Sequence, residues 1–361
     1  MKNIGILTGG GDCPGLNAVI RAAYKTLKDN CECKIIGIRD GYDGFIFNHC
    51  EEITSEMARG ILEKGGTILG TSNKGNPLQY PVEHENGTIE FVDYSDKIIE
   101  TYNMQDLDGI ITIGGEGTLN IADKLSKKGI NYVGVPKTID NDIYDTDMTF
   151  GFNTAVQIAT DAIGRIHSTA ESHHRVMLVE TMGRDAGWIA LYAGMAGGGD
   201  IILLPEIPYS MDALVKKLKE RYDHGKKFSI IVVSEGAKPI GGYVFGKENP
   251  KNIYDRIKLG GIAMKLADEI EELTDFECRS TVLGYVQRGG TPTCYDRILA
   301  TRYGCAAARA FLNGEFGKMV SLQGTDIVLK DVSKNAGKKR LVDLDNPLIK
   351  DALSLGISLG I

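Results

Sequence analysis

The segment 136–142 combines a lysine, a threonine hydroxyl and two aspartates within seven residues. It follows the apolar run 132–135, so the pattern predicts a buried strand that ends in a loop. Asp140 and Asp142 stand two positions apart, and in an extended chain their side chains would point the same way. A base, a second carboxylate, a hydroxyl and a cation are the groups that phosphoryl transfer uses. An acidic turn is the alternative, because Asp and Asn are common turn residues.

The rest of the chain predicts short strands that alternate with helices. Apolar runs rich in β-branched residues predict strands at 4–7, 34–38, 109–113, 132–135, 175–179, 200–204 and 229–233. Stretches of helical length lie between them or follow them, at 16–28, 119–128, 155–169, 211–224 and 258–273. This alternation predicts an α/β fold with parallel sheets covered on both faces. Ligands bind at the carboxyl ends of such strands, so the residues that follow each strand are the candidates for a site.

Composition excludes several classes of protein. The chain has 361 residues, which predicts two or three domains, and no apolar run approaches the ~18 residues of a membrane span. The net charge of −7 argues against a nucleic-acid partner. The seven cysteines are an odd number without a Cys-x-x-Cys pair, so neither disulfides nor a zinc ribbon are expected. A reducing cytoplasm is the expected location.

Two glycine-rich loops follow predicted strands and suggest phosphate binding. In the loop 9–15, backbone N–H groups and a helix N-terminus would form an anion cradle, with a tight turn as the alternative. It lacks the Gly-Lys-Ser/Thr ending of a Walker loop, and Pro14 stands where the dinucleotide fingerprint has its third glycine. In the loop 114–118, Glu116 offers a carboxylate suited to Mg²⁺. Gly117 beside it leaves room for a phosphate.

Four arginines lie at or near apolar runs: Arg175, Arg184, Arg279 and Arg288. Arginine binds phosphate with two parallel hydrogen bonds, which makes these residues candidates for an anionic substrate. Each of them taken singly is more often the partner of a carboxylate in a salt bridge.

Five motifs, in order between residues 4 and 304, resemble those of the phosphofructokinases. They are Gly-Gly-Gly-Asp-Cys-Pro-Gly, Gly-Gly-Glu-Gly-Thr, Thr-Ile-Asp-Asn-Asp, Met-Gly-Arg, and Gly-Tyr-Val-Gln-Arg-Gly-Gly with Tyr295, Asp296 and Arg297 after it. The resemblance implies the phosphofructokinase fold, with two similar Rossmann-like domains and mostly parallel sheets. It implies a phosphoryl-donor domain at 1–150 plus about 289–332, and a sugar-phosphate domain at about 151–288 plus 333–361.

The resemblance also implies a reaction, the Mg²⁺-dependent transfer of the ATP γ-phosphoryl group to the 1-hydroxyl of fructose 6-phosphate. Asp140 would be the general base, Thr138 would position the substrate or the phosphoryl group, and Asp142 would orient the metal or the base. Lys137 and Arg184 would complete the catalytic set.

The same resemblance assigns the binding residues. The donor and its metal would contact Gly11, Asn73, Lys74, Glu116, Gly117 and Thr118, with Glu116 on Mg²⁺. The sugar phosphate would contact Met182, Gly183, Arg184, Glu235, Tyr285 and Arg288, in addition to Thr138 and Asp140. Arg175 and Arg279 would reach the site of a neighbouring subunit, which implies a homodimer or a homotetramer.

The residues that bear on the identity of the phosphoryl donor indicate different donors. Gly117 is typical of ATP-dependent members, because an aspartate there would occupy the space of the α-phosphate. Lys137 is typical of pyrophosphate-dependent members. Asn73 stands where the family usually has an arginine against the donor phosphates, and Lys74 could replace it only as a point charge. The steric argument is the stronger one and favours ATP, with pyrophosphate as the alternative donor.

Two other classes of protein compete with this interpretation. A different nucleotide kinase could share only the Gly-Gly-Glu-Gly-Thr loop, but the Asp140 and Asp142 loop and the Met182 motif argue against it. A sugar-phosphate sensor without activity would be expected to lack Asp140, Glu116 or an arginine, and the chain has all of them.

Overall fold

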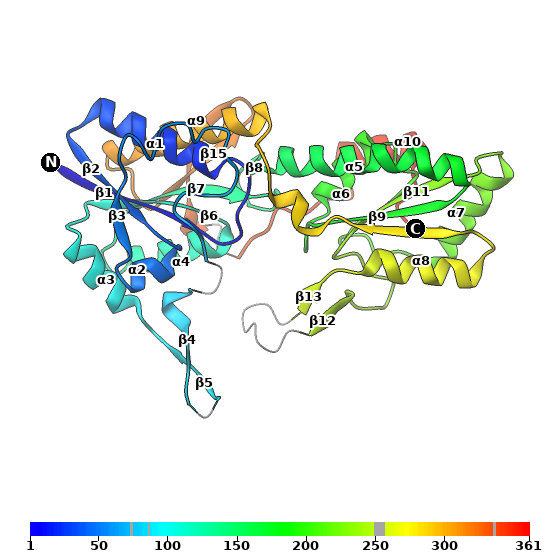
Figure 1. Ribbon diagram of the computed structural model, residues 1–361, viewed down its shortest axis with the longest axis horizontal. Coiled ribbons are helices and arrows are strands. Elements are labelled where there is room, and N and C mark those ends of the chain that lie inside the picture. Colours follow the sequence, from blue (N-terminus) through cyan, green and yellow to red (C-terminus); the bar gives the residue numbers. More distant parts are fainter. Residues whose placement is uncertain (73–74, 86, 249–256, 335–336) are drawn as a thin grey trace. The chain divides into compact units, whose positions relative to one another are not determined.

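The computed structural model describes residues 1–72, 75–85, 87–248, 257–334 and 337–361 (Figure 1). The predicted donor contacts Asn73 and Lys74 lie outside the described residues. The chain forms two compact units. Unit 1 comprises Met1–Thr138, Ile143–Gly151 and Arg288–Lys339, and unit 2 comprises Ile139–Asp142, Phe152–Gln287 and Arg340–Ile361.

Unit 1 contains a sheet with the strand order β16-β15-β7-β6-β1-β2-β3, and β8 adds to the end of β7. The strands are β1 (Lys2–Gly9), β2 (Cys33–Ile38), β3 (Cys50–Glu52), β6 (Gly109–Gly114), β7 (Tyr132–Thr138), β8 (Phe150–Gly151), β15 (Lys318–Gln323) and β16 (Asp326–Asp331). Only the edge strands β3 and β16 pair antiparallel in this sheet. The neighbours β1, β6 and β7 are parallel, so their carboxyl ends lie side by side.

Helices cover both faces of this sheet (Figure 1). On one face lie α1 (Leu16–Asn30) and α9 (Cys294–Leu312), and on the other lie α2 (Tyr42–Ile46), α3 (Ser95–Met104) and α4 (Glu116–Ser126). The sheet buries apolar side chains such as Leu7, Ile110 and Tyr132 beneath α2, α3 and α4. A small hairpin, β4 (Tyr80–Glu83) and β5 (Ile89–Val92), and the short helices η1 (Pro77–Gln79) and η3 (Val332–Lys334) complete the described part of this unit.

Unit 2 contains a smaller sheet with the order β10-β11-β9-β14, in which every pair is parallel. Its strands are β9 (Val176–Thr181), β10 (Ile201–Leu203), β11 (Ser229–Ser234) and β14 (Cys278–Val282). Figure 1 shows α5 (Phe152–His173) and α6 (Trp188–Ala196) on one face and α8 (Ile262–Leu273) on the other. The face with α8 also buries leucines of α7 (Met211–Asp223) against the sheet. The unit further holds β12 (Gly246–Glu248), β13 (Ile257–Leu259), η2 (Gly284–Arg288) and α10 (Pro347–Ser354).

The predicted α/β class with parallel sheets is confirmed, and each predicted strand is present within a few residues of its predicted bounds. Several boundaries differ, among them those of α5, which spans Phe152–His173 instead of 155–169. β7 continues three residues past its predicted end, because β8 pairs with Lys137 and Thr138. α4 begins at Glu116 instead of residue 119, and α8 begins at Ile262 because Ile257–Leu259 pair with β12 as a strand. No helix among the described residues is long and apolar enough to cross a membrane.

Candidate active site

Lys137 stands at the end of β7 beside the glycine loop that follows β1. Only 4% of Lys137 is exposed, and its Nζ donates a hydrogen bond to the carbonyl oxygen of Gly11. A Cβ atom on Gly10 would lie 3.4 Å from the same Nζ. A buried cation is costly unless anionic or hydrogen-bonding groups surround it. The lysine therefore places a positive charge against the glycine loop, beside backbone that a phosphate could approach.

Arg288 contacts the same loop from the end of η2. Its guanidinium donates to the carbonyl oxygen of Asp12 over 3.2 Å, and a Cβ atom on Gly11 would lie 2.9 Å from the same nitrogen. Glycine at position 11 thus lets the arginine lie against the backbone. Within unit 1 the structure brings Gly11, Lys137 and Arg288 together, although the sequence analysis assigned Arg288 to the sugar phosphate.

Cys13 is a packing residue of this loop. It is fully buried, and its thiol lies 3.7 Å from the carbonyl oxygen of Phe150, to which it donates. Burial raises the pKa of the Cys13 thiol far above its usual range. The thiol therefore stays neutral and adds no negative charge beside Lys137.

The second glycine loop runs directly into α4, whose N-cap is Gly115. Among the described residues, a Cβ atom at position 117 would meet no atom within 4 Å, so they leave the space beside it open. Thr118 is 8% exposed and packs its side chain against Gly9 and Gly114, while its carbonyl oxygen accepts a 3.0 Å hydrogen bond from Tyr42. Position 117 therefore leaves room for a ligand, whereas little of the Thr118 side chain is exposed to contact one.

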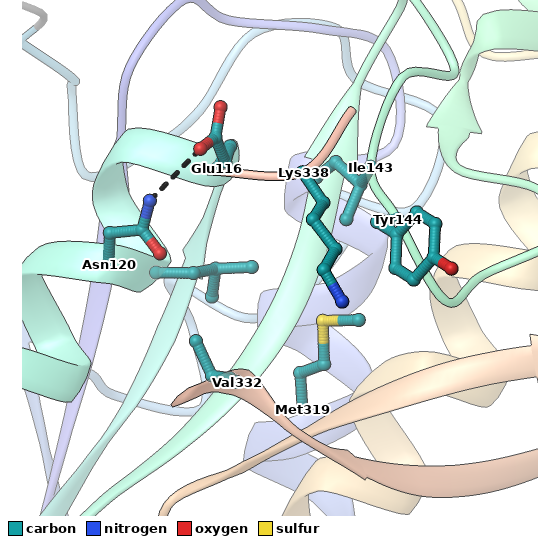
Figure 2. Close-up of a pocket in the computed structure, with 8 residues that line it drawn as sticks. Glu116, Asn120, Ile143, Tyr144, Met319, Val332 and Lys338 are labelled. Carbon is teal, nitrogen blue, oxygen red and sulfur yellow. Dashed lines mark hydrogen bonds between the residues drawn. The ribbon is translucent and has the colours of Figure 1, made fainter. Parts of the chain in front are cut away.

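The Glu116 carboxylate lines a pocket on the side of α4 that faces β15 and η3 (Figure 2). Its Oε1 accepts hydrogen bonds from the Asn120 amide at 3.1 Å and from the Gly337 N–H at 3.0 Å. The other lining residues are Leu119, Ile143, Tyr144, Met319, Val332 and Lys338, with the Lys338 ammonium 5.2 Å from the centre of the Tyr144 ring. Sequence reasoning identified Glu116 but not the others, because they carry no motif, and Met319, Val332 and Lys338 lie about 200 residues further along the chain.

The surroundings of Glu116 are compatible with Mg²⁺. Among the described residues, both hydrogen bonds to this carboxylate end on Oε1, and Oε2 has none. Mg²⁺ is commonly held by one or two carboxylates together with phosphate oxygens and water. The described part of the chain has no group of three or more His, Cys, Asp or Glu side chains placed to hold a metal. Glu116 therefore fits a metal that binds mainly through the phosphates of a ligand.

The segment that carries the two aspartates forms a turn. Thr138 ends β7, and its carbonyl oxygen accepts a 2.8 Å hydrogen bond from the Thr149 hydroxyl. Asn141 has a left-handed backbone with φ of 53° and is 1% exposed. The chain is therefore not extended here, and the expectation that Asp140 and Asp142 point the same way because of extended geometry is wrong. The positions of both carboxylates depend on what holds this turn.

In unit 2 the structure brings together the ends of β9 and β11. Met182, Gly183 and Arg184 follow β9, and the backbone N–H of Arg184 donates to the Glu235 carboxylate over 3.3 Å. Gly183 and Arg184 both have positive φ, at 142° and 50°. This tight turn places the Met-Gly-Arg motif and Glu235 at one edge of the sheet.

Gln287 supports this edge and was missed by sequence reasoning. It is fully buried, its side-chain oxygen accepts from the Met182 N–H at 3.4 Å, and its amide donates to the Gly284 carbonyl oxygen. The signal was available, because Gln287 lies inside the Gly-Tyr-Val-Gln-Arg motif. Tyr285 of the same motif is 74% exposed.

Arg175 and Arg279 lie at the opposite edge of this sheet. Arg175 directly precedes β9 and pairs with Glu277 at 2.7 Å, and Arg279 near the start of β14 pairs with the same carboxylate at 2.5 Å. The Arg175 guanidinium holds the pKa of Glu277 below its usual value. A six-residue strand is roughly 20 Å long, so within one chain Arg175 is remote from Met182.

Replacing Gly183 by alanine is expected to destabilise unit 2. A Cβ atom there would lie 2.5 Å from the Ala186 carbonyl oxygen, and φ of 142° strains any other residue. We expect the free energy of unfolding to fall by about 1–3 kcal/mol, measured by urea unfolding with the fluorescence of Trp188, the only tryptophan in the chain. Gly225→Ala is the control, since φ there is 83° but no atom lies within 4 Å of the added Cβ. Equal unfolding midpoints for the two variants would contradict the role of the Ala186 contact.

Comparison with known proteins gives one consistent result. The phosphofructokinase family model matches residues 3–311. The chain is 51% identical over 359 residues to the ATP-dependent 6-phosphofructokinase 2 of Clostridium perfringens, covering 99% of this chain and 98% of that protein. It is 50% identical over 326 residues to a pyrophosphate–fructose 6-phosphate 1-phosphotransferase of Amycolatopsis methanolica, covering 90% and 92%. The crystal structure of Pichia pastoris phosphofructokinase in the T-state is 29% identical with a TM-score of 0.77, over 93% of this chain and 35% of that longer chain.

Proposed function

The chain belongs to the phosphofructokinase family, and from this premise we propose that it is an ATP-dependent 6-phosphofructokinase. The family resemblance seen in the motifs is thereby confirmed. In the proposed reaction the 1-hydroxyl oxygen of fructose 6-phosphate bonds to the γ-phosphorus of ATP, and the bond between that phosphorus and the bridging oxygen breaks. ADP leaves, and the product is fructose 1,6-bisphosphate, as in glycolysis.

The open space at Gly117 is the observation that carries the choice of ATP. No atom lies within 4 Å of the position that a Cβ atom would take there, so no side chain of the described residues occupies the place expected for the α-phosphate. Pyrophosphate has only two phosphoryl groups and no α-phosphate, so the open space would not help it to bind. The ATP-dependent names of most of the similar relatives agree with this choice.

Pyrophosphate remains a second candidate donor because of Lys137. Its buried ammonium at the glycine loop supplies positive charge that a small, highly charged donor would need. The relative from Amycolatopsis methanolica, which is about as similar as the ATP-dependent ones, carries a pyrophosphate-dependent name. ATP phosphates would also be attracted to this lysine, so its presence does not oppose the main proposal.

Asp140 is the proposed general base, which accepts the proton of the sugar 1-hydroxyl as the oxygen bonds to phosphorus. Thr138 positions the substrate or the phosphoryl group, and Asp142 orients the base or the metal. Lys137 and Arg184 offer positive charge to the negative charge that spreads over the phosphoryl oxygens during transfer. Because the reaction needs little covalent chemistry from the protein, positioning and charge supply most of the rate.

For the donor, Gly11, Gly117 and Thr118 are the proposed contacts, with Asn73 and Lys74 as further ones outside the described residues. Glu116 is the proposed ligand of Mg²⁺, which would neutralise part of the charge on the donor phosphates when bound. Thr118 has little exposed side chain, so we expect its contribution to come through the backbone at the start of α4.

For the acceptor, Met182, Gly183 and Arg184 are the proposed contacts of the sugar phosphate, and Glu235 is the proposed partner of a sugar hydroxyl. Tyr285 and Arg288 are proposed for the 6-phosphate. We assign donor binding to the unit with the two glycine loops and most acceptor contacts to the unit with the Met-Gly-Arg motif, whereas Arg288 belongs to the unit with the glycine loops.

Arg175 and Arg279 are proposed to act in the site of a neighbouring subunit, so that the enzyme is a homodimer or a homotetramer. Their location at the far edge of the sheet from Met182 supports this assignment. A cytoplasmic location remains a prediction.

Initial rates with fructose 6-phosphate and Mg²⁺, with ATP or pyrophosphate as the only donor, test the proposal. We expect turnover with ATP and at least a tenfold lower rate with pyrophosphate. Turnover with pyrophosphate alone would replace ATP by the second candidate donor. Tight binding of fructose 6-phosphate without turnover on either donor would instead indicate a sensor.

A further inference from the structure

The turn that carries the proposed base has an unfavourable backbone. Asn141 is not a glycine, yet it has φ of 53°, and it is almost fully buried. Asparagine adopts a left-handed conformation more readily than other residues with a side chain, but still at some cost in free energy, so contacts from the surroundings help to hold it. Because Asp140 directly precedes Asn141, the torsions of this turn decide where the Asp140 carboxylate lies.

Arg340 contacts two carbonyl groups of this turn within unit 2. Its backbone N–H donates to the Asp142 carbonyl oxygen over 2.8 Å, and its guanidinium donates to the Asn141 carbonyl oxygen over 3.3 Å. Two donors from one residue thus bind consecutive carbonyl groups, which fixes the orientation of the peptide unit between them. A hydrogen bond from a charged donor is among the stronger ones in proteins.

Arg340 is itself held by Trp188 at the start of α6. The guanidinium carbon lies 4.2 Å from the centre of the indole ring, and the indole N–H donates to the Arg340 carbonyl oxygen over 2.8 Å. Trp188 is 3% exposed, so the cation–π contact is shielded from water, which strengthens it.

Glu206 forms hydrogen bonds with both segments that carry Trp188 and Arg340. Its carboxylate accepts from the Gly187 N–H at 3.0 and 3.1 Å and from the Val342 N–H at 2.9 Å. Gly187 precedes Trp188 and Val342 lies two residues after Arg340. Burial raises the pKa of Glu206, and its hydrogen bonds with Val342 and Gly187 partly oppose this shift. The two backbone donors, which form three hydrogen bonds, fit a carboxylate acceptor.

We propose that Arg340 is a positioning residue that holds the 139–142 turn, and through it the Asp140 carboxylate, in the arrangement that accepts the proton. The proposal rests on the proposed function, since it gives Arg340 a role in the same reaction. Arg340 acts on backbone carbonyl groups of the turn and not on the substrate. Its loss should therefore lower kcat and leave the binding of fructose 6-phosphate largely intact.

The first part of the test compares Arg340→Ala, Arg340→Lys and Arg309→Ala with the wild-type enzyme. Every variant keeps the backbone N–H at position 340, and Arg309 is an exposed arginine on α9 that serves as the matched control. We expect kcat to fall about 10- to 100-fold in Arg340→Ala, with KM for fructose 6-phosphate changed by less than about threefold. Arg340→Lys keeps the charge but not the planar fork, so it should recover only part of kcat. Thermal unfolding of each variant shows whether it is folded.

The second part is a double-mutant cycle with Asp140→Asn. If Arg340 acts through Asp140, then Arg340→Ala should lower kcat by less than about twofold once Asp140 has been replaced. A folded Arg340→Ala enzyme with wild-type kcat would overturn the inference, and so would a loss confined to KM or a full additive loss in the Asp140→Asn background. A wild-type protein without turnover on either donor would overturn the proposed function and this inference with it.

Discussion

Replacing Asp140 by asparagine is expected to lower kcat by about 10²–10⁴-fold and to leave the affinity for fructose 6-phosphate nearly unchanged. Asparagine has almost the size and shape of aspartate, so the buried turn can keep its conformation. An amide cannot accept the proton that leaves the sugar 1-hydroxyl, so the attacking oxygen must lose it to water. Steady-state rates with saturating ATP give kcat, and calorimetric titration with fructose 6-phosphate gives the affinity.

Asp212→Asn is the matched control for this experiment. Asp212 is an exposed acid in the first turn of α7, so the same chemical change occurs in the same unit at a residue with no assigned role. It should keep wild-type kcat. The assignment of Asp140 as the base would be wrong if Asp140→Asn lost affinity for the sugar phosphate while turnover persisted.

The sequence predicted the strands and the two glycine loops because these features are local. An apolar run with β-branched residues specifies a buried strand by itself, and a loop of glycines specifies close approach of backbone to ligand. The chain confirms the strands, down to the neighbouring ends of β1, β6 and β7, and places a glycine loop after β1 and after β6. Lys137 was identified for the same reason, since it directly follows such a strand.

The turn at Asn141 could not be predicted in this way. Nothing local requires a left-handed asparagine, and Asp-Asn-Asp is compatible with an extended chain or with several turns. The conformation is favoured by Arg340, which is 199 positions away along the chain, and by Trp188 beneath it. Neither residue stands in a motif, so only the fold reveals the contact.

The arginines illustrate the same limit. Arg175, Arg184, Arg279 and Arg288 looked equivalent in the sequence, each beside an apolar run. In the fold, Arg184 lies at the carboxyl edge of the smaller sheet, whereas Arg175 and Arg279 lie at its amino edge with Glu277 between them. The direction of the strand decides at which edge of the sheet each arginine lies. A short stretch of sequence does not show which end of a strand a ligand will contact.

Replacing Gly117 by aspartate is expected to lower the ATP-supported kcat/KM by at least about 10²-fold and to spare any rate with pyrophosphate. A carboxylate would enter the open space at this position and repel the α-phosphate, and two like charges about 4 Å apart at the protein surface interact by about 4 kcal/mol. The variant should fold, because a Cβ atom at position 117 meets no atom within 4 Å and an acidic side chain suits the first turn of α4. Rates with each donor, measured under identical Mg²⁺, give the result.

Gly117→Ala separates the effect of the carboxylate from that of any side chain at this position. Alanine adds only the Cβ atom and favours the helix by roughly 0.5–1 kcal/mol, so it should keep the ATP rate and slightly raise the stability. Loss of the ATP rate in both variants would mean that the space itself is needed by the donor. An unchanged ATP rate in Gly117→Asp would show that the α-phosphate lies elsewhere, and the open space at Gly117 would then no longer explain the use of ATP.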